Sequence, residues 1–309
     1  MTRILEPGQI EAFAQRAIPR IRLPSAQGPF AARAARLRRL AAPGAPGQAI
    51  AEYLHLMAAV AERQAAALGA CAPRLPTADD IARARAHQMP VIHATGWPRP
   101  DAWRELAVEL AATAAATAGA PATLHEIHAR LRAAPSEELE TQADALLAAR
   151  SGAIDRAAAP FMMAALQVQW VAAASRLGAQ ALAPLEVPGV CPACGMLPVA
   201  SVVRADRDSQ GYRYLHCPLC ATEWHLVRVT CSQCQDTAHI AYHSIEGGTD
   251  AIRAEACDEC GTYRKILYQE KDPEVEPVAD DLASLALDLL MAEAGYHRGS
   301  GNPLLWQEH

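Results

Sequence analysis

The 309-residue sequence contains no apolar run that could span a membrane. A transmembrane helix needs about 20 consecutive apolar residues, and every apolar stretch here is interrupted before that length. Met1–Ile18 also lacks the charged n-region and the apolar h-region of a secretory signal peptide. These two absences predict a soluble protein located in the cytoplasm.

Common catalytic motifs are missing as well. The sequence has no glycine-rich phosphate loop, no Gly-x-Ser-x-Gly elbow and no carboxylate pair that stands out. Lysine is confined to Lys265 and Lys271, so arginine carries nearly all of the basic charge, and the formal net charge is −6. Because the catalytic motifs are missing, we expect a protein that is not an enzyme.

Cysteine, by contrast, is concentrated in the C-terminal half. Eight of the nine cysteines form four Cys-x-x-Cys pairs, and the first two pairs recur after 40 residues as the third and fourth. The pairs are Cys191/Cys194, Cys217/Cys220, Cys231/Cys234 and Cys257/Cys260. Because four thiolates suit one tetrahedral ion, this register predicts a duplicated four-cysteine module that binds two ions of zinc or mononuclear iron. Gly195 and Gly261 directly follow the second cysteine of their pairs, where a knuckle often needs φ > 0.

The pattern leaves two ligand pairings open. In a consecutive arrangement the first and second pairs hold one ion and the third and fourth pairs hold the other, whereas a cross-braced arrangement would join the first and third pairs. The 40-residue period favours the consecutive arrangement, because each repeat then closes its own site. Disulfides or a redox dithiol are less favoured, because a cytoplasmic chain keeps its thiols reduced. Cys71 lies outside the pattern and is interpreted as an ordinary small residue.

Histidines offer further candidate ligands, but none is favoured. His125 and His128 are three residues apart rather than the four of a zinc-protease helix, so we interpret them as a surface pair. The histidines near the knuckles are interpreted as strand residues or neighbours of the ligands; these are His216, His225, His239 and His243. Four cysteines per ion leave no open coordination position, so hydrolytic metal catalysis is not expected.

The first 187 residues predict a helical domain, because alanine, leucine, glutamate and arginine dominate and apolar residues recur every three or four positions. Expected helices cover 7–18, 29–41, 47–69, 78–88, 100–117, 122–133, 136–150 and 154–180. Thr77 with Asp80 predicts a capping box, and Asp101 and Ser136 are candidate N-caps.

Strand-like segments follow the first knuckle. They cover 199–203, 223–229, 239–245 and 262–268, so each repeat is predicted to form a small sheet clamped by its ion. A last helix is expected over 278–294. The chain is therefore predicted to be α+β, with a helical domain over 1–187, four-cysteine metal modules over 188–229 and 230–270, and a C-terminal acidic helix and tail over 271–309.

Charge is unevenly distributed between the two ends. The first forty residues carry Arg3, Arg16, Arg20, Arg22, Arg33, Arg36, Arg38 and Arg39. The segment after Tyr268 carries Glu270, Asp272, Glu274, Glu276, Asp280, Asp281, Asp288, Glu293 and Glu308. Two solvated helix faces of opposite sign are the favoured interpretation, and a docking surface at one or both ends is the alternative.

Longer strings around the cysteines resemble the FdhE family of formate dehydrogenase accessory proteins. They are Cys191-Pro-Ala-Cys-Gly, Tyr214-Leu-His-Cys-Pro-Leu-Cys-Ala-Thr-Glu-Trp-His225 and Ala254-Glu-Ala-Cys-Asp-Glu-Cys-Gly-Thr-Tyr263, followed by Lys265-Ile-Leu-Tyr-Gln-Glu-Lys-Asp-Pro273 and Asp280-Asp-Leu-Ala-Ser-Leu. The resemblance is close over about 188–305 and looser before it, where Ala164-Ala-Leu-Gln-Val-Gln-Trp170 is the clearest match.

This resemblance implies a cytoplasmic assembly factor. Family members are needed for the activity of respiratory molybdenum or tungsten formate dehydrogenases exported by the twin-arginine route, and they contact the catalytic subunit before export. Their cysteine motifs are rubredoxin-like and bind iron, although the spacing alone does not choose iron over zinc.

A nucleic-acid-binding zinc-ribbon protein is the alternative function. Residues 191–265 carry seven basic and nine acidic side chains, or 7 − 9 = −2. A negative surface is poorly suited to binding phosphate, so the assembly factor is favoured.

Overall fold

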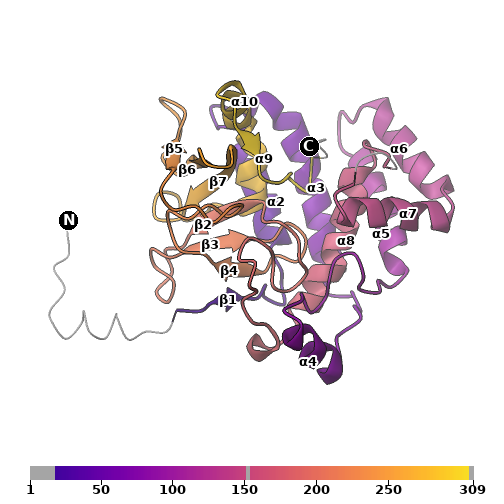
Figure 1. Ribbon diagram of the computed structural model, residues 1–309. Coiled ribbons are helices and arrows are strands. Elements are labelled where there is room, and N and C mark those ends of the chain that lie inside the picture. Colours follow the sequence, from indigo (N-terminus) through magenta and orange to yellow (C-terminus); the bar gives the residue numbers. More distant parts are fainter. Residues whose placement is uncertain (1–17, 151–153, 306–309) are drawn as a thin grey trace.

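The computed structural model describes residues 18–150 and 154–305, and it pairs a helical region with one continuous β-sheet (Figure 1). The helices before the knuckles are α2 (Phe30–Leu40), α3 (Ala51–Leu68), α4 (Ala78–Ala86), α5 (Ala102–Ala115), α6 (Ala122–Ala133), α7 (Ser136–Leu147) and α8 (Ala159–Ala174). They confirm the helices expected between 29 and 150, with shorter ends. The helix expected over 7–18 lies almost wholly outside the described residues.

Helix α8 forms the centre of the helical region. All sixteen of its residues are buried, and it packs against α3, α5 and α7. It begins five residues later than expected, and Pro160 falls in its first turn, where a missing N–H costs nothing. A helix with no exposed face must be surrounded by other elements, and Figure 1 shows α8 next to α3, α5 and α7.

Local capping rules hold at one helix and fail at two. Thr77 forms the predicted capping box, because its Oγ1 accepts from the Asp80 N–H at 3.2 Å and its own N–H donates to Asp80 at 3.0 Å. The Asp101 carboxylate instead pairs with Arg104 at 3.0 Å and makes no cap bond. Ser136 is already the first helical residue, after Pro135, so it is not the N-cap.

The two cysteine repeats share a single eight-stranded sheet. Its strands are β1 (Ile21–Arg22), β2 (Ala200–Val203), β3 (Arg213–His216), β4 (Glu223–His225), β5 (Ile240–His243), β6 (Ile252–Cys257), β7 (Thr262–Tyr268) and β8 (His297–Arg298). The order is β1-β4-β3-β2-β7-β6-β5, and β8 also pairs with β7. The sequence predicts one small sheet per repeat, but parallel pairing of β2 with β7, with Ser201 opposite Ile266, joins them.

The C-terminal helix is divided at Ser284 into α9 (Pro277–Ala283) and α10 (Leu285–Glu293), whereas the sequence predicts one helix. The buried Lys265 ammonium donates to the carbonyl oxygens of Asp281 at 2.8 Å and Ser284 at 3.0 Å. The Ser284 hydroxyl donates to the Asp280 carbonyl at 2.7 Å. In a continuous helix these carbonyl oxygens would accept hydrogen bonds from backbone N–H groups one turn later. Here side chains satisfy them instead, and the helix is interrupted at Ser284.

The basic and acidic ends of the chain pair with each other, because α2 packs against α9. Arg33 contacts Glu276 at 3.0 Å, and Arg36 contacts Asp280 and Asp272, both at 2.6 Å. The Arg33 and Asp280 side chains are buried. For these residues neither interpretation of the charged ends is right, since the charges are neither solvated faces nor free docking surfaces.

Among residues 18–150 and 154–305, no helix combines the length and hydropathy needed to cross a bilayer.

Candidate metal centres

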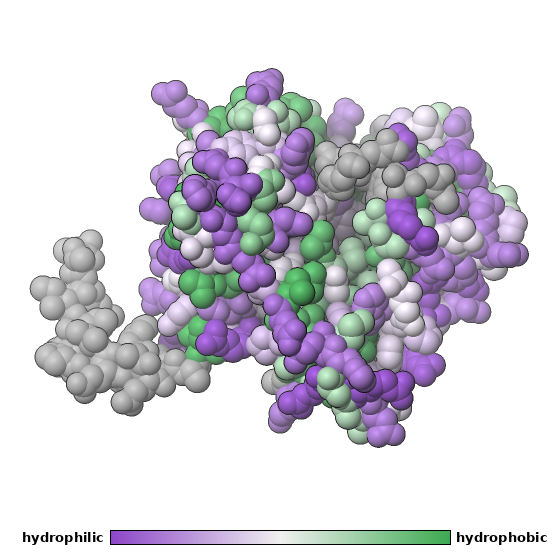
Figure 2. Space-filling view, in the orientation of Figure 1, coloured by the Kyte–Doolittle hydropathy of each residue, from purple (hydrophilic) through white to green (hydrophobic). Residues whose placement is uncertain are grey.

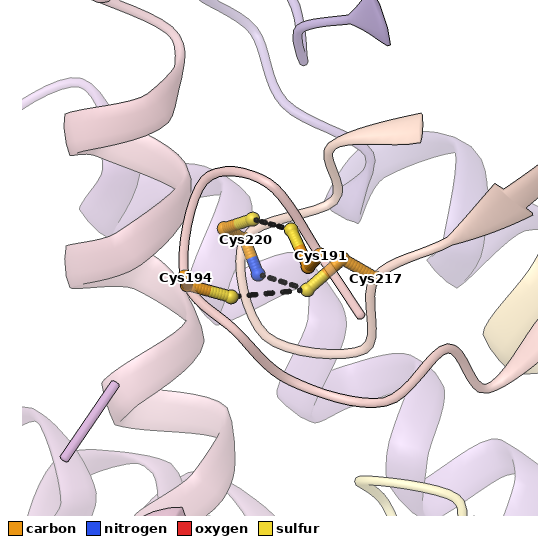
Figure 3. A group of neighbouring side chains, drawn as sticks. All are labelled: Cys191, Cys194, Cys217 and Cys220. Carbon is orange, nitrogen blue, oxygen red and sulfur yellow. Dashed lines mark hydrogen bonds between the residues drawn. The ribbon is translucent and has the colours of Figure 1, made fainter. Parts of the chain in front are cut away.

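The first four cysteines meet at the junction between the sheet and the helices. Cys191 and Cys194 lie in the knuckle before β2, and Cys217 and Cys220 lie in the turn between β3 and β4. The Sγ atoms are 3.5 Å apart for Cys191 and Cys220 and 3.3 Å apart for Cys194 and Cys217, and all four lie within 4.8 Å of one another (Figure 3). These separations are too long for disulfide bonds.

The second four cysteines repeat this arrangement. Cys231 and Cys260 have Sγ atoms 3.6 Å apart, as do Cys234 and Cys257, again within 4.8 Å overall. A tetrahedron with metal–sulfur bonds of about 2.3 Å has edges of about 3.8 Å, close to these separations. The grouping follows the consecutive arrangement, and each cluster could hold one metal ion.

All four knuckles share one backbone conformation. The residue after the second cysteine has positive φ at Gly195 (82°), Ala221 (56°), Gln235 (67°) and Gly261 (67°). The N–H of each donates to the carbonyl of the first cysteine, at 2.8, 3.2, 3.1 and 2.8 Å respectively. This turn aims both sulfurs of a pair to one side. The predicted role of the two glycines is confirmed, whereas Ala221 and Gln235 adopt a conformation that L-residues usually avoid.

A threonine stands beside the last cysteine of each cluster. Thr222 Oγ1 lies 3.2 Å from Cys220 Sγ, and Thr262 Oγ1 lies 2.9 Å from Cys260 Sγ. A hydroxyl that donates to a thiolate stabilises its charge. Sequence reasoning missed these residues, although both fall two positions after the last cysteine and 40 residues apart, in the cysteine register.

Electrostatics favour a cation inside the first cluster. Burial, together with the neighbouring thiols, raises the pKa of Cys194 and Cys217 well above the ordinary thiol value. Four buried sulfurs therefore cannot all become thiolates at neutral pH unless a positive charge lies between them. In the second cluster burial also acts to raise the pKa of Cys231, but the N–H groups of Cys234 and Gln233 lower it to about 7.

The two clusters differ sharply in exposure. All four cysteines of the first are buried, whereas in the second Cys234 is exposed and Cys260 is half-buried. The helical region seals the first cluster: Ile92 N–H donates to the Ala193 carbonyl at 2.8 Å, and Ala94 N–H donates to the Cys194 carbonyl at 2.9 Å. The buried Gln167 amide of α8 donates to the Pro218 carbonyl at 2.6 Å. The first cluster therefore links the two halves of the fold.

Buried charge lies beside the second cluster. Arg213 contacts Glu255 at 3.0 Å, and Arg264 donates to the Ser232 hydroxyl at 2.9 Å, next to Cys231. Burial lowers the pKa of Arg264 to about 9, and its arginine neighbours add to this effect. Four thiolates around a divalent ion carry two excess negative charges, so these guanidinium groups stabilise a loaded site.

The other candidate ligands lie outside both clusters. His216 Nδ1 is 3.1 Å from Glu223, and His239 Nδ1 is 3.2 Å from Asp236. His225 lies 3.4 Å from Arg20, and His243 packs on Tyr296 with ring centroids 5.5 Å apart. Within the described ranges no histidine belongs to a group that could hold a metal ion, and Cys71 belongs to none either. The histidines outside such groups include His125, His128 and the four histidines near the knuckles.

Comparison with known proteins finds matches to one family along nearly the whole chain. Family models for the FdhE N-terminal, central and C-terminal domains match residues 18–187, 190–228 and 229–305. The chain is 41% identical to the FdhE homolog of Cronobacter sakazakii over 308 residues, covering 98% of this chain and 97% of that one. It is 39% identical to FdhE of Escherichia coli strain SMS-3-5 over 302 residues, covering 97% and 96% respectively.

A solved structure carries the same fold. The crystal structure of the FdhE protein from Pseudomonas aeruginosa superposes with a TM-score of 0.79 at 36% identity. The match covers 94% of this chain and 100% of that chain. Together with the two four-cysteine clusters, these matches show that the chain belongs to the FdhE family of formate dehydrogenase accessory proteins.

Proposed function

We propose that this protein binds the immature catalytic subunit of a respiratory formate dehydrogenase in the cytoplasm, before export, and is needed for that enzyme to become active. Family membership over nearly the whole chain is the observation that carries the proposal. An accessory role implies a protein partner, and the family resemblance supports the catalytic subunit as that partner.

The eight cysteines would bind two metal ions in this role, with iron favoured by the family and zinc possible. The clusters fit either ion, because both accept four thiolates in tetrahedral geometry. Closed coordination leaves no position for a substrate, so we propose that the ions shape and stabilise the surface offered to the partner. The protein itself would not oxidise formate.

The metal is identified by anaerobic purification with elemental analysis and a visible spectrum. Iron(III) in four thiolates absorbs in the visible range, whereas zinc is colourless. An iron content of about two per chain with that absorption would assign both clusters to iron. Two equivalents of colourless zinc would reassign them.

The function is tested by deleting the gene and measuring formate oxidation, together with co-purification of the catalytic-subunit precursor on tagged protein. We expect loss of formate oxidation in the deletion strain, rescue by the wild-type protein, and precursor retained on wild type but not on Cys217→Ser. Cys71→Ala is the matched control, because Cys71 lies outside both clusters. Full formate oxidation without the protein would refute the proposal.

The nucleic-acid alternative is checked with single- and double-stranded probes. Because residues 191–265 are net acidic, we expect no retention at physiological salt.

A further inference from the structure

The two ends of the sheet are finished differently. At one end the short N-terminal strand β1 covers β4, with Ile21 opposite Trp224 and Arg22 opposite Glu223. At the other end β5 is the last strand in the order, and nothing in the described part of the chain pairs with its outer side. Figure 1 shows β5 at the margin of the sheet, with its hairpin projecting beyond it.

The register fixes which backbone groups of β5 face outward. The Asp258 N–H donates to the His239 carbonyl at 2.9 Å, so this pair belongs to the hydrogen-bonded set of the β5–β6 ladder. Hydrogen-bonded pairs alternate in an antiparallel ladder. Ala241 and His243 therefore bond to β6, while Ile240 and Tyr242 turn their N–H and C=O groups away from the sheet.

This edge lacks the usual protection against pairing. Proteins commonly shield an exposed edge with lysine, proline or a bulge, but residues 239–245 read His-Ile-Ala-Tyr-His-Ser-Ile. The side chains of Tyr242 and Ile245 are 37% and 38% exposed. The edge therefore presents open hydrogen-bonding groups together with apolar surface, which is the arrangement that binds an added strand.

Charge around the edge indicates which strand would fit. Residues 231–260 contain six acidic side chains and one basic one, Arg253, and two arginines from outside this segment, Arg213 and Arg228, also act electrostatically on Tyr242. Exposed Glu246 and Asp250 lie in the hairpin loop beyond one end of β5, and exposed Asp258 and Glu259 lie in the knuckle at the other. A loaded second cluster would add two negative charges at that same end, which Arg213 and Arg264 offset in part. Basic side chains therefore complement this edge.

We propose that the outer edge of β5 binds an extended, basic segment of the partner polypeptide as an added β-strand. The proposal rests on the proposed function for the identity of the partner, but the chemistry of the segment comes from the edge itself. Ile240 and Tyr242 supply the main-chain hydrogen bonds, Tyr242 supplies an apolar contact, and the flanking carboxylates select for lysine or arginine.

Tyr242→Pro is the direct test, because it removes an outward N–H without touching the bonds to β6, and proline is tolerated on edge strands. Ile240→Lys is the second variant, since an edge lysine blocks pairing while keeping every N–H. The double variant Glu246→Lys/Asp250→Lys reverses the charge of the hairpin loop next to β5. Glu105→Lys/Glu126→Lys makes the same charge change at exposed positions on α5 and α6 and serves as the matched control.

Two probes separate this inference from the proposed function. The first is the catalytic-subunit precursor in a co-purification assay. The second is a short acetylated peptide of alternating valine and lysine, compared with its valine–glutamate counterpart by fluorescence anisotropy at low salt. We expect the basic peptide to bind at least about tenfold tighter than the acidic one and to slow hydrogen exchange at the Ile240 and Tyr242 amides.

Tyr242→Pro should weaken binding of the basic peptide and of the precursor by about tenfold, a loss of the size expected for one hydrogen bond with its packing. Ile240→Lys and the charge reversal should weaken both by a similar factor, the first by blocking strand pairing and the second by removing the charge complementarity. The control should bind like wild type. Equal binding of both peptides, or wild-type binding by all three edge variants, would overturn the inference while leaving the proposed function standing. Tight, edge-dependent binding of the basic peptide with no retention of the precursor would instead refute the proposed function.

Discussion

The pairing of Arg36 with Asp280 yields a quantitative prediction about how the helical region is attached to the C-terminal helix. Arg36 donates to Asp280 through Nε at 2.9 Å and Nη2 at 2.6 Å, and the Asp280 carboxylate also accepts from the Glu276 N–H at 2.8 Å. Burial raises the pKa of Asp280, and Arg36 offsets only part of that rise. Burying this ion pair therefore has a desolvation cost, and removing only one of its two charges should destabilise the fold further.

Removing Arg36 leaves the buried Asp280 carboxylate without a counter-charge, which costs about 3–5 kcal/mol of the free energy of unfolding, whereas replacing both partners is close to neutral. Removing Asp280 costs less, because Arg36 keeps its second partner, Asp272, at 2.6 Å. We expect Arg36→Met to lose that amount, Asp280→Asn to lose about 1–3 kcal/mol, and the double variant to lose no more than Arg36→Met alone. With a urea m-value of about 1–3 kcal/mol/M, Arg36→Met should unfold at about 1–5 M lower urea.

The assay is urea unfolding of metal-loaded protein, followed by circular dichroism, with all variants in one double-mutant cycle. Glu62→Gln is the control, because the Arg38–Glu62 pair is exposed and should contribute under about 1 kcal/mol. Single-variant losses below about 1 kcal/mol, or losses that simply add in the double variant, would refute the reasoning.

Three further predictions concern the metal sites. Fully loaded protein should contain about two ions per chain by elemental analysis, with no loss in Cys71→Ala; one ion per chain would contradict the two-cluster arrangement. A chelator with colorimetric detection should release metal in two phases, the fast one from the second cluster because Cys234 is exposed, so Cys234→Ser should abolish only the fast phase. Ala221→Gly should raise the free energy of unfolding by up to about 1 kcal/mol, because glycine relieves the cost of φ = 56°, and an unchanged or lower urea midpoint would show that the turn is not strained.

The sequence predicts the helices and the cysteine grouping because both depend on local signals. Apolar spacing locates the helices between 29 and 150, and the 40-residue repeat groups the thiols before any coordinates are known. Four strands are missed. Strands β1 and β8 have only two residues each, too few to show a pattern, whereas in β3 and β6 the charged residues Arg213 and Glu255 disturb the apolar pattern. These charges are tolerated in a buried sheet only because they face each other at 3.0 Å across it, and that proximity is not visible in either segment alone.

Long-range pairing also explains why Arg33, Arg36 and Asp280 are interpreted wrongly from sequence. Clusters of arginine or of aspartate and glutamate usually mark solvated surface, and the sequence does not state that α2 lies against α9. The same limit applies to the knuckles. Glycine at positions 195 and 261 allows positive φ to be predicted, whereas Ala221 and Gln235 adopt positive φ although their residue types do not predict it. The shared sheet follows from parallel β2–β7 pairing, which depends on how the two repeats pack rather than on either repeat by itself.

The contact between Arg33 and Glu276 spans 243 positions of the chain. At about 5–20 residues per second, a ribosome needs roughly 12–50 s to make the polypeptide between them. During that time Arg33 has no Glu276 to pair with, and the strand that β1 covers does not yet exist, because β4 begins at Glu223. The N-terminal helices therefore cannot complete their own interior while the chain is being made. Folding must finish late and from both ends together, so a chain truncated before Glu276 should leave a buried guanidinium uncompensated and be degraded rather than accumulate as a stable helical fragment.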